Sequence, residues 1–152
     1  MTRVVVTGLG IVSAAGTGLE ANRQAVQEGR SGLGRLTRFP SPRCGHFPVA
    51  EVDGFDRLPG FPRTVALGRV ALREAVASAG LDGEAREARE LLRRAGIAAG
   101  TCVGGMPETE AAVEGVLAGQ MPDPSVWLHH ECAFTTHSLA REWDIRGPAM
   151  TI

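Results

Sequence analysis

Four side chains with metal-binding chemistry lie close together in the last quarter of the chain. They are His129, His130, Cys132 and His137, and imidazole and thiolate groups are ligands that zinc prefers. On the helix expected there, His130 and Phe134 share one face, whereas the other three side chains scatter over different faces. The spacing therefore favours packing or surface roles over a metal site, and we predict no metal.

The three cysteines are potential nucleophiles, but none has the neighbours that activate a thiol. Cys102 lies in the small-residue segment 99–103, where a thiol usually behaves as a small buried apolar group. Cys44 lies in a loop and is expected to be exposed or half-buried. Because a nucleophilic thiolate needs a base or a helix N-terminus beside it, we assign no catalytic residue. An odd number of cysteines in such a chain indicates a reducing, cytoplasmic setting.

Two other patterns that could do chemistry favour structural roles. Gly8 and Gly10 follow an apolar run as in a dinucleotide-binding turn, but Ser13 holds the third fingerprint position. We therefore interpret the two glycines as sites of close backbone packing. Glu108 and Glu110 are expected to face solvent at a helix start, where the macrodipole favours acids.

Composition limits the class of protein. The chain has 152 residues, 43% of them apolar, which suits one globular domain. Its net charge is −1, and its 16 basic residues are all arginines scattered among acids, so a nucleic-acid partner has little support. No run approaches the ~18 apolar residues of a membrane span, and the apolar run 4–15 is only a weak match to a signal peptide.

The expected elements alternate between strands and helices, which predicts an α/β fold. Strands are expected over 3–12, 97–103 and 149–152, with a short candidate at 47–52, and helices over 17–28, 63–79, 84–95, 108–117 and 131–143. Thr17 is the expected cap of the first helix, Gly29, Gly80 and Gly119 are expected stops, and residues 30–62 form a long loop.

The last residues read as the beginning of an element. Gly147-Pro148 is a turn signal, and the apolar and β-branched residues 149–152 that follow suit a buried strand. Domains seldom finish on such a strand. We therefore expect residues 1–152 to form one domain that is incomplete at its C-terminal end.

Five segments, in order, resemble the β-ketoacyl synthases, the condensing enzymes of fatty acid and polyketide synthesis. These segments are RVVVTGLGIVS over 3–13 with Gly16, QEGRSG over 27–32, ALREA over 71–75 with AGL over 79–81, GTCVGG over 100–105, and RGP over 146–148. The resemblance covers nearly the whole chain. It implies the N-terminal portion of a thiolase-like αβαβα layered fold.

The resemblance also implies an acyltransferase activity, the decarboxylative Claisen condensation of an acyl thioester with malonyl-carrier. In that family a Thr-Ala-Cys stretch carrying the nucleophile follows the Gly-Pro strand, and two histidines lie further on. That nucleophile would fall beyond Ile152. The chain by itself is therefore expected to be inactive, and no cofactor is implied.

Site residues carried over from the resemblance are pocket and interface positions. Val103 matches a position that lines the acyl pocket, and four residues fall where the family's dimer interface reaches the partner's acyl channel: Val126, Trp127, His130 and Phe134. The segment 129–132 departs from the family by being bulkier and more polar than in the fatty acid enzymes.

The implied partners are an acyl carrier protein and the C-terminal part of the synthase, on this or a second polypeptide, within a homo- or heterodimer. One alternative is a non-catalytic partner subunit of the chain-length-factor type. Another is a truncated reading frame without a function of its own.

Overall fold

The computed structural model describes residues 3–55 and 60–152, which divide into two compact units. The first unit comprises Met1–Asp56 and Val70–Ala79, and the second comprises Arg57–Arg69 and Gly80–Ile152. The long helix α2 (Arg63–Ser78) begins in the second unit and continues in the first. Each unit mixes helices and strands, so the predicted α/β class is confirmed.

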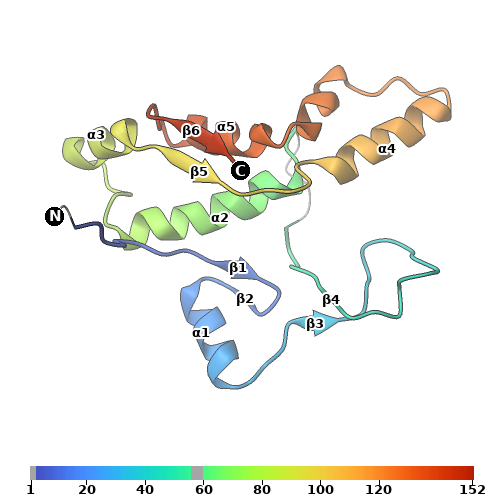
Figure 1. The fold of residues 1–152 in the computed structure, drawn as a ribbon, viewed down its shortest axis with the longest axis horizontal. Helices are drawn as coiled ribbons and strands as arrows, with labels where there is room; N and C mark the ends of the chain where they lie inside the picture. The colour runs from blue at the N-terminus through green and yellow to red at the C-terminus, as the bar shows by residue number, and fades with distance from the viewer. Residues whose placement is uncertain (1–2, 56–59) are drawn as a thin grey trace. The chain divides into compact units, whose positions relative to one another are not determined.

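The first unit contains two small antiparallel sheets and one complete helix (Figure 1). Its elements are β1 (Val12–Ser13), β2 (Gly16–Thr17), α1 (Leu19–Gln27), β3 (Leu33–Gly34) and β4 (Val49–Ala50). Val12 pairs with Thr17 in the first sheet, and Leu33 pairs with Ala50 in the second. The predicted strand at 47–52 is thus formed over two residues.

Gly8 and Gly10 lie directly against the backbone of α2. A methyl group on Gly8 would lie 2.1 Å from the Ala75 carbonyl oxygen, and one on Gly10 would lie 1.9 Å from the Ala71 carbonyl oxygen. Real Cβ atoms do not approach that closely, so only glycine fits either position. The interpretation of these glycines as packing sites is confirmed.

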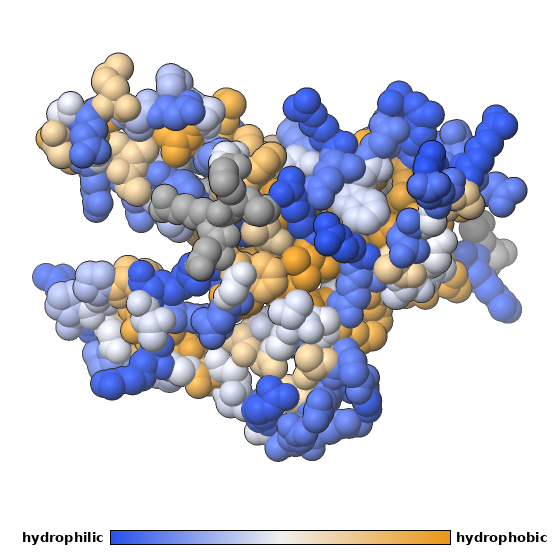
Figure 2. Space-filling model, turned by 180° about the vertical axis from the view of Figure 1, so that it is seen from behind, coloured by the Kyte–Doolittle hydropathy of each residue, from blue (hydrophilic) through white to orange (hydrophobic). Residues whose placement is uncertain are grey.

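The buried strand predicted over 3–12 is wrong, because Val12, the first residue of β1, is the only residue of that run in a strand. Val4, Val5 and Val6 are 95%, 71% and 79% exposed. A strand needs a neighbouring backbone to accept its hydrogen bonds. Here side chains of α2 accept them instead, Ser78 from the N–H of Leu9 at 2.9 Å and Glu74 from that of Ile11 at 2.9 Å. Apolar residues at the surface are visible in orange in Figure 2.

The N-terminus of α1 is capped by a residue distant in sequence. Gly18, with φ of 91°, is the N-cap residue and Thr17 is not, which corrects that prediction. Glu74 on α2 accepts the N–H of Leu19 at 2.6 Å in addition to that of Ile11. These two backbone hydrogen bonds hold the pKa of Glu74 below its ordinary value.

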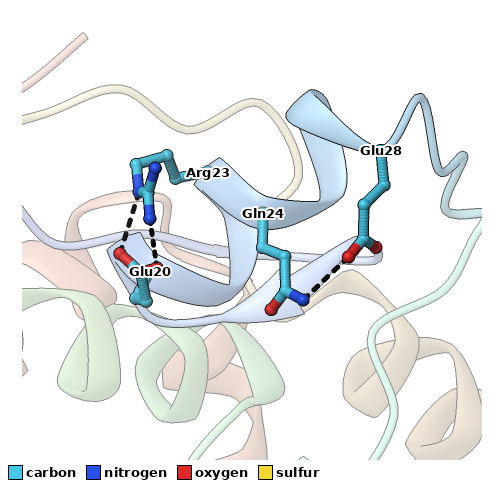
Figure 3. A network of polar contacts seen from close by, with 4 residues as sticks. All are labelled: Glu20, Arg23, Gln24 and Glu28. Carbon is cyan, nitrogen blue, oxygen red and sulfur yellow. Dashed lines mark hydrogen bonds and ion pairs between the residues drawn. The ribbon is translucent and has the colours of Figure 1, made fainter.

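The exposed face of α1 carries a short polar network (Figure 3). Glu20 accepts from the guanidinium of Arg23 one turn on, with an Nε–Oε2 distance of 2.9 Å, and the amide of Gln24 donates to Glu28 at 2.7 Å. Such pairs add modestly to helix stability. Gly29 then ends the helix with φ of 64°, as predicted.

The second unit is organised around a parallel pair of strands. Its complete elements are α3 (Arg86–Arg94), β5 (Ile97–Ala99), α4 (Met106–Leu117), the 3-10 helix η1 (Pro124–His130), α5 (Ala133–Glu142) and β6 (Ala149–Thr151). β5 pairs with β6 in register Ile97 to Ala149, and α5 packs against both strands (Figure 1).

Buried threonines join the elements of this core. Thr136 on α5 is fully buried and its hydroxyl lies 2.7 Å from that of Thr151 on β6. Thr135 is likewise buried, 2.8 Å from the hydroxyl of Thr64 on α2. Because buried hydroxyls need partners, these two pairs fix how α5 sits between α2 and the strands.

Two expectations for this unit need correction. The strand predicted over 97–103 ends at Ala99, because the chain turns at Gly104 and Gly105 into α4. The final strand forms and pairs with β5, but Ala149 and Met150 are exposed instead of buried. Gly80 and Gly119 end their helices with positive φ, as predicted.

Within the described residues, no helix combines the length and apolar character that crossing a bilayer requires.

Replacing Gly10 by alanine tests the packing of the N-terminal run on α2. The added methyl would overlap the Ala71 carbonyl, so we expect the free energy of unfolding to fall by about 1–3 kcal/mol. Gly34→Ala is the matched control, because nothing lies within 4 Å of a methyl there. Urea denaturation followed by circular dichroism measures both variants, and equal losses would contradict the packing argument.

Replacing Glu74 by glutamine tests the acid dependence of the first unit. Since the folded pKa of Glu74 is lowered, its contribution is fully present above the ordinary carboxyl value of about 4.3 and is lost as pH falls through the lowered value. Glu74→Gln should therefore have a lower free energy of unfolding than the parent at pH 7. On acidification, its free energy of unfolding should fall less than that of the parent. Denaturation midpoints between about pH 7 and pH 3 measure this, with Glu90→Gln as the control, and parallel curves for Glu74→Gln and the parent would refute it.

Candidate functional site

The turn between β5 and α4 makes the tightest contact around the predicted site. The N–H of Gly105 donates to the His129 carbonyl at 2.7 Å. A methyl on Gly105 would lie 2.7 Å from that oxygen and 2.9 Å from the Cβ of Pro62, and Gly104 has φ of 51°. Two glycines are therefore required, and they bring residues 103–106 directly against residues 129–132.

His129 is a packing residue, as the spacing favoured. Its side chain is 6% exposed, and Nε2–H donates to the Gly60 carbonyl at 3.2 Å. Its ring meets Phe134 edge to face at 4.8 Å. The other ring nitrogen, Nδ1, is buried and has no hydrogen-bond partner among the described residues. The His129 side chain therefore links η1 to the segment that precedes α2.

η1 is positioned by a side-chain cap. Asp123 accepts the N–H of Ser125 at 2.8 Å, and this hydrogen bond is the main reason that the pKa of Asp123 lies below its ordinary value. The 3-10 helix then presents Val126 half-buried and Trp127 41% exposed.

Glu108 is buried, which corrects the expectation that it faces solvent. It is 8% exposed, and its Oε1 accepts the N–H of Arg63 at 3.3 Å. Arg63 is the first residue of α2, whose preceding residue is Pro62, so the helix lacks a Ser, Thr, Asp or Asn side chain at its start. That missing cap is the sequence signal that could have indicated an acceptor from elsewhere.

A groove of about 670 Å³ runs along α4 beside His130. It is lined by Met106, Thr109, Glu110, Val113, Glu114 and His130. Val103 stands at the turn that begins this helix, with its carbonyl accepting the N–H of Met106 at 3.0 Å, and is 45% exposed. The structure therefore brings Val103 and His130 to the same end of α4.

Phe134 belongs to a second groove, of about 920 Å³, on α5. Phe61 and Leu128 also line it, and the guanidinium of Arg69 lies 4.6 Å above the Phe61 ring while pairing with Glu142. Sequence reasoning did not identify Phe61 or Arg69. The five predicted site residues thus lie at the α4 groove, on η1 and at the α5 groove, and do not line one cavity.

The cysteines differ in part from expectation. Cys102 is exposed, not buried, because β5 ends before it reaches the turn; Cys44 is exposed as expected, and Cys132 is half-buried. Among the residues that the structure describes, no group of three His, Cys, Asp or Glu side chains is placed to hold a metal ion.

No protein-family model matches the chain. Two named relatives are similar to part or nearly all of the chain. A Streptomyces coelicolor protein assigned as a polyketide beta-ketoacyl synthase 2 is 51% identical over 57 residues, which are 36% of this chain and 13% of that protein. The 3-oxoacyl-[acyl-carrier-protein] synthase 2 of Coxiella burnetii is 29% identical over 99% of this chain, which spans 38% of its length.

Two solved structures share the fold of the chain. The ishigamide ketosynthase/chain length factor superposes with a TM-score of 0.83 and 29% identity, over 99% of this chain and 39% of that chain. AntDE:AntF, a type II PKS acyl-carrier protein in complex with its ketosynthase, matches with a TM-score of 0.60 and 23% identity over 96% of this chain and 40% of that chain.

Replacing Gly105 by alanine tests the contact that builds the site. The methyl would press on both His129 and Pro62, so we expect a loss of about 1–3 kcal/mol in unfolding free energy. Gly100→Ala is the control, since a methyl there would lie 4.0 Å from its nearest neighbour. Chemical denaturation gives the free energies, and a Gly105→Ala variant as stable as the control would show that the contact is not tight.

Proposed function

Because the chain belongs to the β-ketoacyl synthase family, we propose that it supplies scaffold, acyl-pocket wall and dimer surface to a β-ketoacyl-[acyl-carrier-protein] synthase. The observation that carries the proposal is the glycine turn at 104–105, which brings Val103 to the same end of α4 as His130, a residue that lines the α4 groove. The family resemblance placed the same two residues at the pocket and the interface.

The reaction proposed for the assembled enzyme is a decarboxylative Claisen condensation. A thiolate displaces the carrier thiol from an acyl thioester, malonyl-carrier loses CO₂, and the resulting carbanion attacks the acyl-enzyme carbonyl and releases the thiolate. Developing negative charge on the carbonyl oxygen needs backbone N–H donors. In this scheme the residues of this chain bind and orient the acyl group, while the nucleophile comes from the complementary part.

The proposed partners follow from the same scheme. They are an acyl carrier protein, the part of the synthase that carries the nucleophile, and a second subunit that completes a dimer. Exposed apolar side chains along α4 and η1 support a subunit contact, among them Val113, Val116, Trp127 and Leu128. Exposed free thiols at Cys44 and Cys102 fit a reducing, cytoplasmic compartment.

A second candidate function is that of a non-catalytic partner subunit of the chain-length-factor type. The similarity to the ishigamide ketosynthase/chain length factor favours it. Such a subunit would shape the pocket of an active ketosynthase without taking part in acyl transfer.

Assembly with a second polypeptide separates the two candidates. The chain is mixed with either a C-terminal ketosynthase piece beginning near its Thr-Ala-Cys stretch or a full-length ketosynthase, and native mass spectrometry and malonyl-carrier condensation are measured. If the C-terminal piece restores condensation activity, the chain is the N-terminal part of a synthase. If the chain forms a complex only with the full-length ketosynthase, it is a non-catalytic partner subunit. Condensation by the chain without either would overturn both.

Enlarging Val103 tests the pocket wall within whichever complex is active. Val103→Trp narrows the acyl channel, so products should become shorter by at least one condensation cycle, with complex formation unchanged. The control is Val26→Trp on α1, where Val26 is 80% exposed. Mass spectrometry of released products gives the chain lengths, and an unaltered product distribution would remove Val103 from the pocket.

A further inference from the structure

Two of the three cysteines lie beside the glycine turn that builds the candidate site. Cys102 lies two residues before Gly104, in the connection that follows β5, and its side chain is exposed. Cys132 is half-buried and immediately precedes α5. Neither thiol takes part in the reaction proposed above, so the structure leaves two reactive groups at the site without a function.

The segments that carry these two cysteines run past each other in opposite directions. The N–H of Gly105 donates to the His129 carbonyl at 2.7 Å. A methyl on Gly104 would lie 3.5 Å from the Cα of Cys132. One step back along the first segment therefore meets a later residue of the second. Cys102 lies two residues before Gly104, a distance of at most about 7 Å, and this course directs it toward Cys132.

The connection that contains Cys102 is free to adjust. A disulfide requires two Cα atoms about 4.4–6.8 Å apart. Cys102 lies after the last residue of β5 and before the first residue of α4, so the regular hydrogen bonds of those elements do not hold it. A shift of this connection brings the two thiols within bonding distance without unfolding a helix or a strand.

We propose that Cys102 and Cys132 form a reversible disulfide when the protein meets hydrogen peroxide. The exposed Cys102 thiolate attacks a peroxide oxygen, so an S–O bond forms, the O–O bond breaks, and hydroxide leaves as water after taking up the thiol proton. The Cys132 thiolate then attacks the Cys102 sulfur, forming the S–S bond and releasing a second water from the broken S–O bond. The two thiols lose two electrons, which the peroxide gains, and a dithiol reductant reverses the reaction.

The disulfide joins the turn that begins α4 to the start of α5. Val103 follows Cys102, and His130 lies two residues before Cys132, so oxidation fixes the two predicted site residues at the same end of α4. Disulfides in a reducing compartment are mostly transient and sense oxidation, and this one has that character. Its formation does not depend on the proposed function, because both cysteines belong to this chain.

Oxidation of the full chain with hydrogen peroxide tests the proposed bond. Cleavage after glutamate residues without a reductant separates the three cysteines, and mass spectrometry identifies any linked pair. Cys44→Ser is the matched control, because Cys44 is exposed but has no part in the bond. Cys132→Ser and Cys132→Ala remove the second thiol, and circular dichroism checks that both variants fold. The peptides that carry the cysteines are 29–51, 91–108 and 132–142.

We expect peptides 91–108 and 132–142 to be linked in the folded parent and in Cys44→Ser, and to separate after dithiothreitol. The parent unfolded in guanidinium should give about tenfold less of this link at equal peroxide, because the native contact supplies the proximity. The two Cys132 variants should instead keep a sulfenic acid on Cys102 that dimedone traps. Equal linkage in the folded and unfolded chain, preferential linkage of Cys44, or no linkage in the folded parent would overturn the proposal.

Discussion

The N–H of Gly105 reaches the carbonyl of His129 at a distance that no side chain on Gly105 would permit, and the preceding Gly104 has a positive φ that favours glycine. Three other features of the second unit depend on that contact. η1 is drawn close enough for His129 to sink beside Phe134 and donate to Gly60. α4 begins at the turn, so Glu108 in its first turn meets the start of α2. Val103 and His130 lie at the same end of α4.

In the first unit, too, glycines allow two backbone segments to come into direct contact. Gly8 and Gly10 let the backbone of the N-terminal run lie directly on α2. Carbonyl oxygens of the helix occupy the space that a side chain on either glycine would need. Close approach then allows Glu74 to accept two backbone N–H groups and cap α1. Because the first N–H groups of a helix have no acceptor within the helix, glycine placement and carboxylate capping act together. The glycines bring the N-terminal run close to α2, and Glu74 then accepts the N–H groups of Ile11 and Leu19.

Local patterns predicted the helices and their stops well, and predicted poorly what depends on distant neighbours. The apolar spacing of residues 63–79 and the glycines at 29, 80 and 119 act within a few residues, so the sequence contains the whole signal. The run 3–12 has strand composition, yet a strand exists only where another backbone pairs with it. The burial of Glu108 and the cap supplied by Glu74 likewise come from residues more than 40 positions away.

Residue type also overstated the chemistry near positions 129–137. A histidine can act as a base only if a ring nitrogen can reach a substrate proton. His129 has one nitrogen engaged by the Gly60 carbonyl and the other sealed inside the protein, so its role is to hold a wall in place. Of the two adjacent histidines, His130 is the one that lines a groove. Polar groups that hold the structure in position suit a chain that shapes a pocket. Under the proposed function, the partner polypeptide supplies the nucleophile and the base.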